Sequence, residues 1–213
     1  MGLGGYLMWT PLAREINKRT GGGKMLPVES NGNFIKVIQT PIFENNPYIC
    51  QDIKDDEFLL PVPLNNPKTN YCMSDTPEKA IHRYDKHVIH QICEAYGINN
   101  ADLKCDIFLS KEEISQSLDF LKNVKSKFIT IDPHTKDEYT VNKRYPFDKW
   151  QRVVEKIKKE SDFEIVQIGN KTNHVLKGCI DLTGKTSFRQ AAAVISNSCL
   201  HVGAEGGLMH AAT

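Results

Sequence analysis

The C-terminal part of the chain alternates between short apolar runs and helical patterns of apolar residues. Phe128–Ile131 and Glu164–Gly169 are apolar and rich in β-branched residues, which predicts two strands. Between them, residues 147–160 place their apolar side chains at the spacing of an amphipathic helix. With the later segments included, residues 128–213 predict the order β-α-β-β-α-β-α. This order is typical of a parallel sheet covered by helices.

The start of the chain is rich in glycine. Gly2, Gly4 and Gly5 are typical of a turn between a strand and a helix, yet no strand precedes them. We therefore expect the chain to begin inside an α/β unit. The helix that follows either has Thr10 as its N-cap and Pro11 as its first residue, or runs from Gly5 and kinks at Pro11.

The pattern is weaker in the middle of the chain. Residues 20–33 are rich in glycine and asparagine and predict a loop, whereas Phe34–Ile38 predicts a strand. Phe58–Leu60 is at most a short buried segment, because prolines and asparagines surround it. Two amphipathic helices are predicted over residues 78–96 and 111–127.

Composition and charge exclude several classes of function. The chain has 213 residues, of which 40% are hydrophobic and 25% are charged, as in ordinary globular proteins. The net charge of +1 gives no overall field that would attract nucleic acid or anionic lipid. A membrane-spanning helix needs about 18 consecutive apolar residues, and no such run occurs. The N-terminus lacks the layout of a signal peptide, so we expect a cytoplasmic protein of one large or two small domains.

The cysteines and histidines do not predict a metal site. The six cysteines are scattered and form no CxxC motif, which is typical of reduced thiols in the cytosol. His82, His87 and His90 lie on or near the helix predicted over residues 78–96, but they do not share one face of it. No carboxylate completes a ligand set with them. We therefore expect no metal and no cofactor.

The strongest candidate for chemistry follows the last predicted strand, Leu200–Val202. Glu205, Gly206 and Gly207 come next, and His210 lies one helical turn further on. This order places them at the carboxyl end of a strand and at a helix N-terminus, where open α/β sheets bind ligands and free N–H groups attract phosphate. Two structural explanations stay open here, because a double glycine is often only a tight turn and a single histidine is often a surface residue.

Gly184-Lys185-Thr186 partly matches a phosphate-binding P-loop. That motif needs four residues between its two glycines, whereas five separate Gly178 from Gly184. Ser187 is better explained as the N-cap of the helix that follows.

Three segments together resemble one family. Residues 181–212 include, near their end at positions 205–210, an acidic residue, a small residue, Gly, two further residues and His. Residues 2–12 resemble the first loop and helix of the same family, and residues 143–146 (Lys-Arg-Tyr-Pro) resemble its Lys-x-Trp-Pro element. In this order the segments resemble glycosyltransferase family 9, the heptosyltransferase-type family. Residues 20–125 match it only in general character.

The resemblance implies the GT-B architecture, an α/β fold of two Rossmann-like domains with parallel sheets that face a cleft. Residues 1–124 would be the acceptor-side domain, without its first strand, and residues 125–213 a truncated nucleotide-sugar-binding domain. The implied reaction is the inverting transfer of a sugar, such as a heptose, from a nucleotide-sugar donor to lipopolysaccharide or another surface glycan. The implied partners are this donor and a glycan or glycolipid acceptor, with no nucleic acid. The implied location is the cytoplasm, where peripheral contact with the inner membrane surface is compatible with the reaction.

The resemblance also implies a set of donor-binding residues. They are Thr135, Lys143, Glu205, Gly206, Gly207 and His210. Lys143 would contact the leaving diphosphate, and the glycine N–H groups and His210 would be further donors. Glu205 would instead hold a sugar or ribose hydroxyl, because like charges repel. Such a transferase needs no metal if these groups neutralise the diphosphate.

The first loop departs from the family pattern. The family usually has Gly-Asp there, with the aspartate proposed as the base, and this chain has Gly5, which can accept no proton. A missing general base typically costs about 10²–10⁴ in rate. Two functions therefore stay open, an active transferase and a catalytically impaired relative that binds nucleotide-sugar or glycan. A sugar epimerase is a weaker alternative, because it would need a GxGxxG motif that residues 2–7 do not supply.

Overall fold

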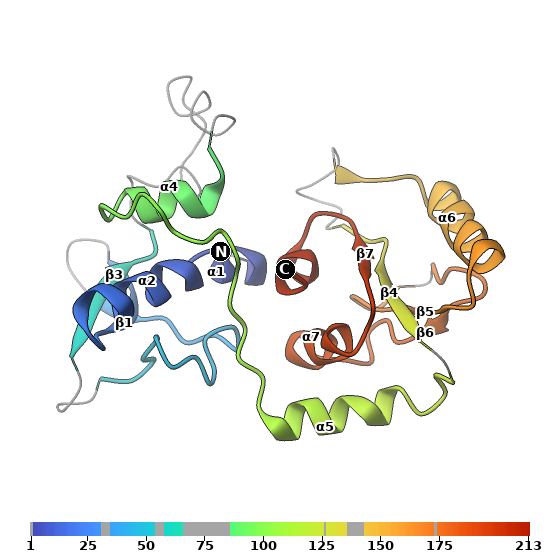
Figure 1. Ribbon diagram of the computed structural model, residues 1–213, viewed down its shortest axis with the longest axis horizontal. Coiled ribbons are helices and arrows are strands. Elements are labelled where there is room, and N and C mark those ends of the chain that lie inside the picture. The colour runs from blue at the N-terminus through green and yellow to red at the C-terminus, as the bar shows by residue number, and fades with distance from the viewer. Residues whose placement is uncertain are drawn as a thin grey trace. The chain divides into compact units, whose positions relative to one another are not determined.

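A computed structural model of the chain is drawn in Figure 1, and it describes residues 2–30, 35–53, 58–65, 86–125, 127–135, 143–172 and 174–213. The chain divides into two compact units, Met1–Phe108 and Leu109–Thr213. The second unit includes helix α5 (Lys111–Phe120), because α5 packs against α7 (Phe188–Ser196). This division differs from the boundary expected after residue 124, which placed α5 in the first domain.

The first unit is built around a three-stranded sheet in the order β2-β1-β3. Its central strand β1 (Lys24–Ser30) pairs in parallel with β3 (Leu59–Pro63) and antiparallel with β2 (Ile35–Val37). The strand predicted at the position of β2 is confirmed over its described residues. The short segment predicted near Phe58 extends into β3, although Phe58 itself is 61% exposed.

Strand β1 corrects the loop predicted over residues 20–33. The glycines that follow α2 (Thr10–Thr20) only end that helix, and Gly21 takes a left-handed φ of 68° at its C-cap. The next apolar residues, such as Met25, are fully buried. Burial in the centre of a sheet stabilises the strand even with Pro27 inside it, because strand preference depends mainly on packing.

Two helices open the first unit. Leu3–Leu7 forms α1, so the glycine-rich start is helical and the turn predicted there is wrong. Helix α2 begins at Thr10, after a break at residues 8–9, with Pro11 in its first turn. Of the two alternatives, the separate helix is therefore confirmed, although its N-cap is Trp9 and not Thr10.

Helix α4 (Val88–Glu94) begins after His87 because the ring of His87 caps it. The Nδ1 atom of His87 accepts a hydrogen bond from the N–H of Ile89 at 3.2 Å. The helix predicted over residues 78–96 is thus confirmed only from Val88 onward. Residues 66–85, with His82 among them, lie outside the described residues.

The second unit contains a four-stranded sheet in the order β6-β5-β4-β7, with every pair parallel. Its strands are β4 (Phe128–Asp132), β5 (Glu164–Gln167), β6 (Ile180–Asp181) and β7 (His201–Gly203). The chain adds β5 and β6 on one side of β4 and then returns to place β7 on the other side. The β-α-β-β-α-β-α order predicted for residues 128–213 is confirmed.

Helices cover both faces of this sheet (Figure 1). Helix α6 (Phe147–Glu160) lies on one face and buries Trp150 and Val154, while α5 and α7 lie on the other. The strands alternate between two cores, as the pleat requires. The core under α6 comprises Ile129, Ile131, Trp150, Val154, Ile165 and Leu176. The core under α7 comprises Phe128, Val166, Ile168, Leu182, Ala191, Val194, Ile195 and Leu208.

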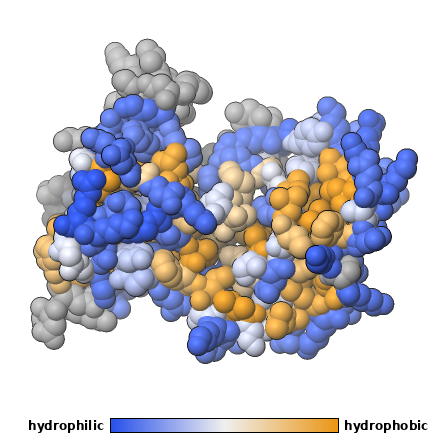
Figure 2. Space-filling model, viewed as in Figure 1, coloured by the Kyte–Doolittle hydropathy of each residue, from blue (hydrophilic) through white to orange (hydrophobic). Residues whose placement is uncertain are grey.

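The outer surface of α6 is hydrophilic. It lies at the right of the view, where Figure 2 shows hydrophilic residues along the rim. Charged side chains therefore face the solvent on this helix, while its apolar stripe faces the sheet. Over the described part of the chain, we find no helix whose length and hydropathy would let it cross a bilayer.

Helix α5 is tied to α7 by an ion pair. Ser110 and Glu113 form a capping box at the start of α5, with Glu113 N–H donating to Ser110 Oγ at 3.1 Å. Glu113 also accepts from Arg189 of α7, with 2.6 Å between Nη2 and Oε2. The hydrogen bond from Arg189 is the main reason that the pKa of Glu113 lies below its usual value. This ion pair and the packing of the two helices place α5 in the second unit.

Candidate functional site

The candidate site lies where the order of the second sheet reverses. Strands β4 and β7 are parallel neighbours, and Asp132 pairs with Gly203 at their carboxyl ends. The N–H of Ala204 donates to the carbonyl of Asp132 at 3.0 Å. The loops that follow the two strands therefore leave the sheet at the same edge. Open α/β sheets bind ligands in the crevice at such a switch point.

Three of the predicted site residues meet at this edge. The Nζ of Lys143 forms an ion pair with Oε2 of Glu205. The Nε2 of His210 lies 3.2 Å from Oε1 of the same carboxylate. The side chains of Lys143 and Glu205 are 38% and 42% exposed, whereas that of His210 is 13% exposed. The carboxylate of Glu205 thus joins a lysine and a histidine that lie far apart along the chain.

Gly206 and Gly207 form the junction between β7 and a short helix. Gly206 is the N-cap of α8 (Gly207–Ala211), so the predicted order of strand, glycines and helix is confirmed. Gly206 has extended backbone angles, with φ −178°. A Cβ on it would meet only the carbonyl of Ala204, at 3.8 Å. The fold itself therefore does not require glycine at position 206.

Thr135 and Gly5 are the other two positions that the sequence analysis singled out for the site. Thr135 is half-buried in the loop after β4, at the same edge of the sheet as Glu205. Residues 136–142, which separate Thr135 from Lys143, lie outside the described residues. Gly5 is buried inside α1 of the first unit.

Asp132 is a candidate that the sequence analysis missed. It ends β4, and burial raises the pKa of its carboxyl to about 6 although the N–H of His134 donates to it. Gly169, with φ +117°, lies so close that a Cβ on it would stand 2.6 Å from Oδ1. A carboxyl with a perturbed pKa at the ligand-binding edge of a sheet is a candidate functional group. The signal in the sequence is an acidic residue directly after an apolar strand.

Three rings near the end of β4 contact one another in series. His134 stacks on Phe147 with 6.0 Å between ring centroids, and Phe147 contacts His174 at 5.5 Å. Buried Gln167 holds the loop of His174, because its amide donates to the carbonyl of His174 at 3.1 Å. The same amide accepts from Leu176 N–H at 2.7 Å. The loops after β4 and β5 are thereby fixed to each other and to α6.

Burial lowers the pKa of two histidines near the switch point, His201 and His210. Burial, and secondarily the charge of Lys143, lowers the pKa of His210. Burial lowers the pKa of His201 to about 4, and its Nδ1 lies 2.9 Å from Oγ1 of Thr130. A neutral imidazole donates one N–H and accepts at its other nitrogen. The ring of His210 can thus donate an N–H to an anion.

The P-loop explanation does not hold in the structure. Lys185 turns back to Asp181, with Nζ donating to the carbonyl of Asp181 at 2.6 Å. Ser187 caps α7 as predicted, because its Oγ accepts from Gln190 N–H at 3.2 Å. Among the residues that the structure describes, no three His, Cys, Asp or Glu side chains lie close enough together to hold a metal ion.

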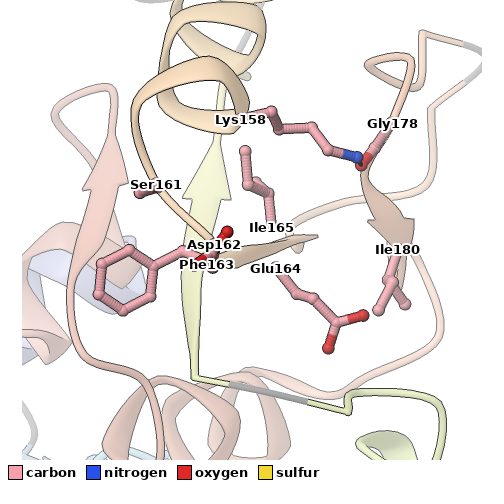
Figure 3. A pocket seen from close by; sticks show the side chains of 8 residues that line it. All are labelled: Lys158, Ser161, Asp162, Phe163, Glu164, Ile165, Gly178 and Ile180. Carbon is pink, nitrogen blue, oxygen red and sulfur yellow. Dashed lines mark hydrogen bonds between the residues drawn. The ribbon is translucent and has the colours of Figure 1, made fainter.

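A hollow of about 220 Å³ lies at the opposite, amino edge of the sheet. Figure 3 shows the side chains that line it, namely Lys158, Ser161, Asp162, Phe163, Glu164, Ile165, Gly178 and Ile180. Lys158 is exposed there, and its Nζ donates to the carbonyl of Gly178 at 2.9 Å. None of the predicted site residues lines this hollow.

A comparison with known families decides the identity of the chain. The model of glycosyltransferase family 9 (heptosyltransferase) matches residues 73–213. The chain belongs to glycosyltransferase family 9. The match includes the Lys143, Glu205 and His210 cluster at the carboxyl edge. The family that the sequence resembled is therefore confirmed.

Solved structures of glycosyltransferases share the fold. The glycosyl transferase family 9 protein of Veillonella parvula matches with a TM-score of 0.66 at 14% identity, over 100% of this chain and 76% of that one. The iron-containing dodecameric glycosyltransferase TibC of enterotoxigenic E. coli matches with a TM-score of 0.63 at 13% identity, over 100% of this chain and 53% of that one. A second TibC structure, in complex with ADP-D-beta-D-heptose, matches with a TM-score of 0.60 at 14% identity, with the same coverage.

These matches confirm the predicted α/β fold of the GT-B class. The chain is shorter than either relative and spans about half the length of TibC. No curated protein matches the sequence.

Proposed function

We propose that this family 9 chain is an inverting, metal-independent glycosyltransferase. In this proposal a nucleotide-sugar donor binds at the carboxyl edge of the second sheet, and its sugar, in the first instance a heptose, moves to a glycan or glycolipid. The observation that carries the proposal is the meeting of Lys143, Glu205 and His210 beside the switch point between β4 and β7. A lysine cation and a histidine N–H at this place suit a diphosphate leaving group.

In the proposed reaction, negative charge develops on the leaving diphosphate, next to Lys143 and His210. The oxygen of an acceptor hydroxyl attacks the anomeric carbon from the face opposite the diphosphate, the bond from that carbon to the diphosphate oxygen breaks, and the hydroxyl proton passes to a base. Negative charge then develops on the leaving oxygen. Lys143 supplies a positive charge and His210 supplies an N–H. Donors held in place before the reaction stabilise the transition state more than the ground state.

The backbone dipole of helix α8 stabilises a diphosphate less than the dipole of a long helix would. Helix α8 has only five residues, so its backbone dipole is small. The side chains of Lys143 and His210 therefore provide most of the proposed stabilisation. The backbone N–H groups of Gly206 and Gly207 are left as weaker donors.

Binding without turnover is a second candidate function. Gly5 occupies the position where the family resemblance implies a base, and it has no group that accepts a proton. Loss of a general base typically costs about 10²–10⁴ in rate. An active enzyme therefore needs a base from another residue, whereas a binding relative needs none.

The remaining parts of the proposal concern the two units and the acceptor. The first unit would hold the acceptor, and the second would hold the donor. The acceptor would be lipopolysaccharide or another surface glycan, reached from the cytoplasmic side of the inner membrane. TibC in complex with ADP-D-beta-D-heptose supports a nucleotide-sugar donor for this family.

Calorimetric titration with ADP, GDP and UDP in EDTA tests donor binding directly. We expect one of the three to bind, and to bind equally well when Mg²⁺ replaces EDTA. Failure of all three to bind would reject the proposal, and binding that depends on the metal would reject its metal-independent form. Initial rates of sugar transfer from the matching nucleotide-heptose then separate the two functions. Turnover supports the transferase, and tight binding without turnover supports the binding relative.

A further inference from the structure

Glu205 occupies the two donors that the proposed function assigns to the diphosphate. One carboxylate oxygen contacts Nζ of Lys143 and the other lies 3.2 Å from Nε2 of His210. A diphosphate presents the same chemistry, because it also offers neighbouring anionic oxygens to a cation and an N–H. Glu205 and the diphosphate therefore compete for the same two partners.

We propose that Glu205 is a positioning residue that holds Lys143 and His210 in the ligand-free site and is exchanged for the donor diphosphate. This inference rests on the proposed function. In the ligand-free site, the contact with Glu205 limits the rotamers of the long Lys143 side chain. With Glu205, both donors are already directed to one point.

Breaking the ion pair between Lys143 and Glu205 costs little free energy because the pair is exposed. Both partners are more than a third exposed, and solvent screens exposed ion pairs so that they contribute little. Glu205 lies in the bend between β7 and α8, so its side chain can rotate away while both elements stay in place. The released carboxylate can then accept a hydroxyl from the sugar or ribose, the role that the family resemblance implies for it.

Exchange predicts a specific dependence on Lys143. If Glu205 competes for Lys143, its removal strengthens nucleotide binding only while Lys143 is present. If Glu205 merely repels the anion, its removal strengthens binding whether Lys143 is present or not. A double-mutant cycle separates these two effects.

The experiment titrates the tightest binder among ADP, GDP and UDP into four proteins by calorimetry. They are the wild type, E205A, K143A and the E205A/K143A double variant. We expect E205A to bind roughly two- to five-fold more tightly than the wild type, the range that an exposed ion pair supports. In the K143A background we expect E205A to change the affinity less than 1.5-fold, roughly, because the competition is gone.

Asp148→Asn is the matched control, because it removes one negative charge from an exposed site on α6 in the same unit. It should leave the affinity unchanged. The inference is overturned if E205A binds no more tightly than the wild type, or if its gain persists in the K143A background. The proposed function fails in a different way, namely if wild type and K143A bind the nucleotide equally.

Discussion

The two edges of the second sheet each carry a lysine, but the lysines do different things. At the carboxyl edge, Lys143 pairs with a side chain, Glu205, in an exposed cluster. At the amino edge, Lys158 donates to the backbone carbonyl of Gly178 and closes the loop before β6. A hollow lies at the amino edge, whereas the charged side chains that could bind a diphosphate gather at the carboxyl edge.

The proposed site therefore rests on the charged side chains at the carboxyl edge and not on the hollow at the amino edge. A parallel sheet gathers the loops that follow its strands at the carboxyl edge, and there these loops carry Asp132, Glu205 and the short helix with His210. The amino edge instead receives the last turn of α6, and Lys158 there balances the negative end of the helix. The following predictions test this comparison, from the largest expected effect to the smallest.

Replacement of glycine should be more costly at the carboxyl edge. In G169A the new Cβ would meet the carboxyl of Asp132 at 2.6 Å and would sit at a φ of +117°. We expect a loss of about 2–3 kcal/mol in the free energy of unfolding, measured with urea. G178A is the matched variant at the amino edge, where the Cβ would meet only the flexible tip of Lys158 at 3.1 Å. It should lose about 1 kcal/mol, and an equal loss in both would contradict the close packing on Asp132.

Removal of the charge of Asp132 should stabilise the fold at high pH. Burial raises the pKa of this carboxyl from 3.8 to about 6, so its charge destabilises the folded state above pH 6 and this cost is relieved as the pH falls toward 4. We therefore expect D132N to be more stable than the wild type by about 1–2 kcal/mol at pH 8, and to show no advantage at pH 4. Urea unfolding at the two pH values measures this difference. The exposed carboxylate variant D148N is the control, and an advantage for D132N that did not change with pH would refute the assignment.

Removal of Lys143 should weaken donor binding, and removal of Lys158 should not. We expect K143A to bind the nucleoside diphosphate about ten-fold more weakly, since it loses a charge-assisted contact. Calorimetry measures the affinity, and circular dichroism checks that the exposed substitution leaves the fold intact. K158A should bind within a factor of about two of the wild type. A stronger effect of K158A than of K143A would move the site to the amino edge.

The smallest effect is expected for Lys158 itself. K158A loses one exposed hydrogen bond to the carbonyl of Gly178 and should lose about 0.5 kcal/mol of stability. The midpoint of urea unfolding detects this shift. A loss of several kcal/mol would show that the hydrogen bond from Lys158 to Gly178 stabilises the fold more than its exposure indicates.

The sequence alone determined most of the local structure in the second unit. Strands β4 and β5 and helix α6 follow from the spacing of their apolar residues, because each pattern is satisfied within a few neighbours. The cap of α7 at Ser187 was equally local. The family resemblance rested on short motifs of the same kind, and the family match confirms it.

The first unit shows where local patterns fail. Strand β1 follows three glycines and contains Pro27, so its local signals indicate a loop. Its preference is set by packing between β2 and β3, which are separated from each other along the chain. The glycine-rich start is helical for the same reason, because contacts elsewhere in the unit bury Leu7 and Trp9 and outweigh the low helix propensity of glycine.

The tertiary structure alone decided how the candidate site is assembled. Glycosyltransferase motifs placed Lys143, Glu205 and His210 in one set, but the carboxylate that joins the other two appears only when β7 lies beside β4. The raised pKa of Asp132 likewise depends on burial at the sheet edge, and sequence neighbours do not reveal burial. Spacing along the chain determines periodicity and capping, whereas electrostatic pairing and desolvation depend on which distant segments the fold brings together.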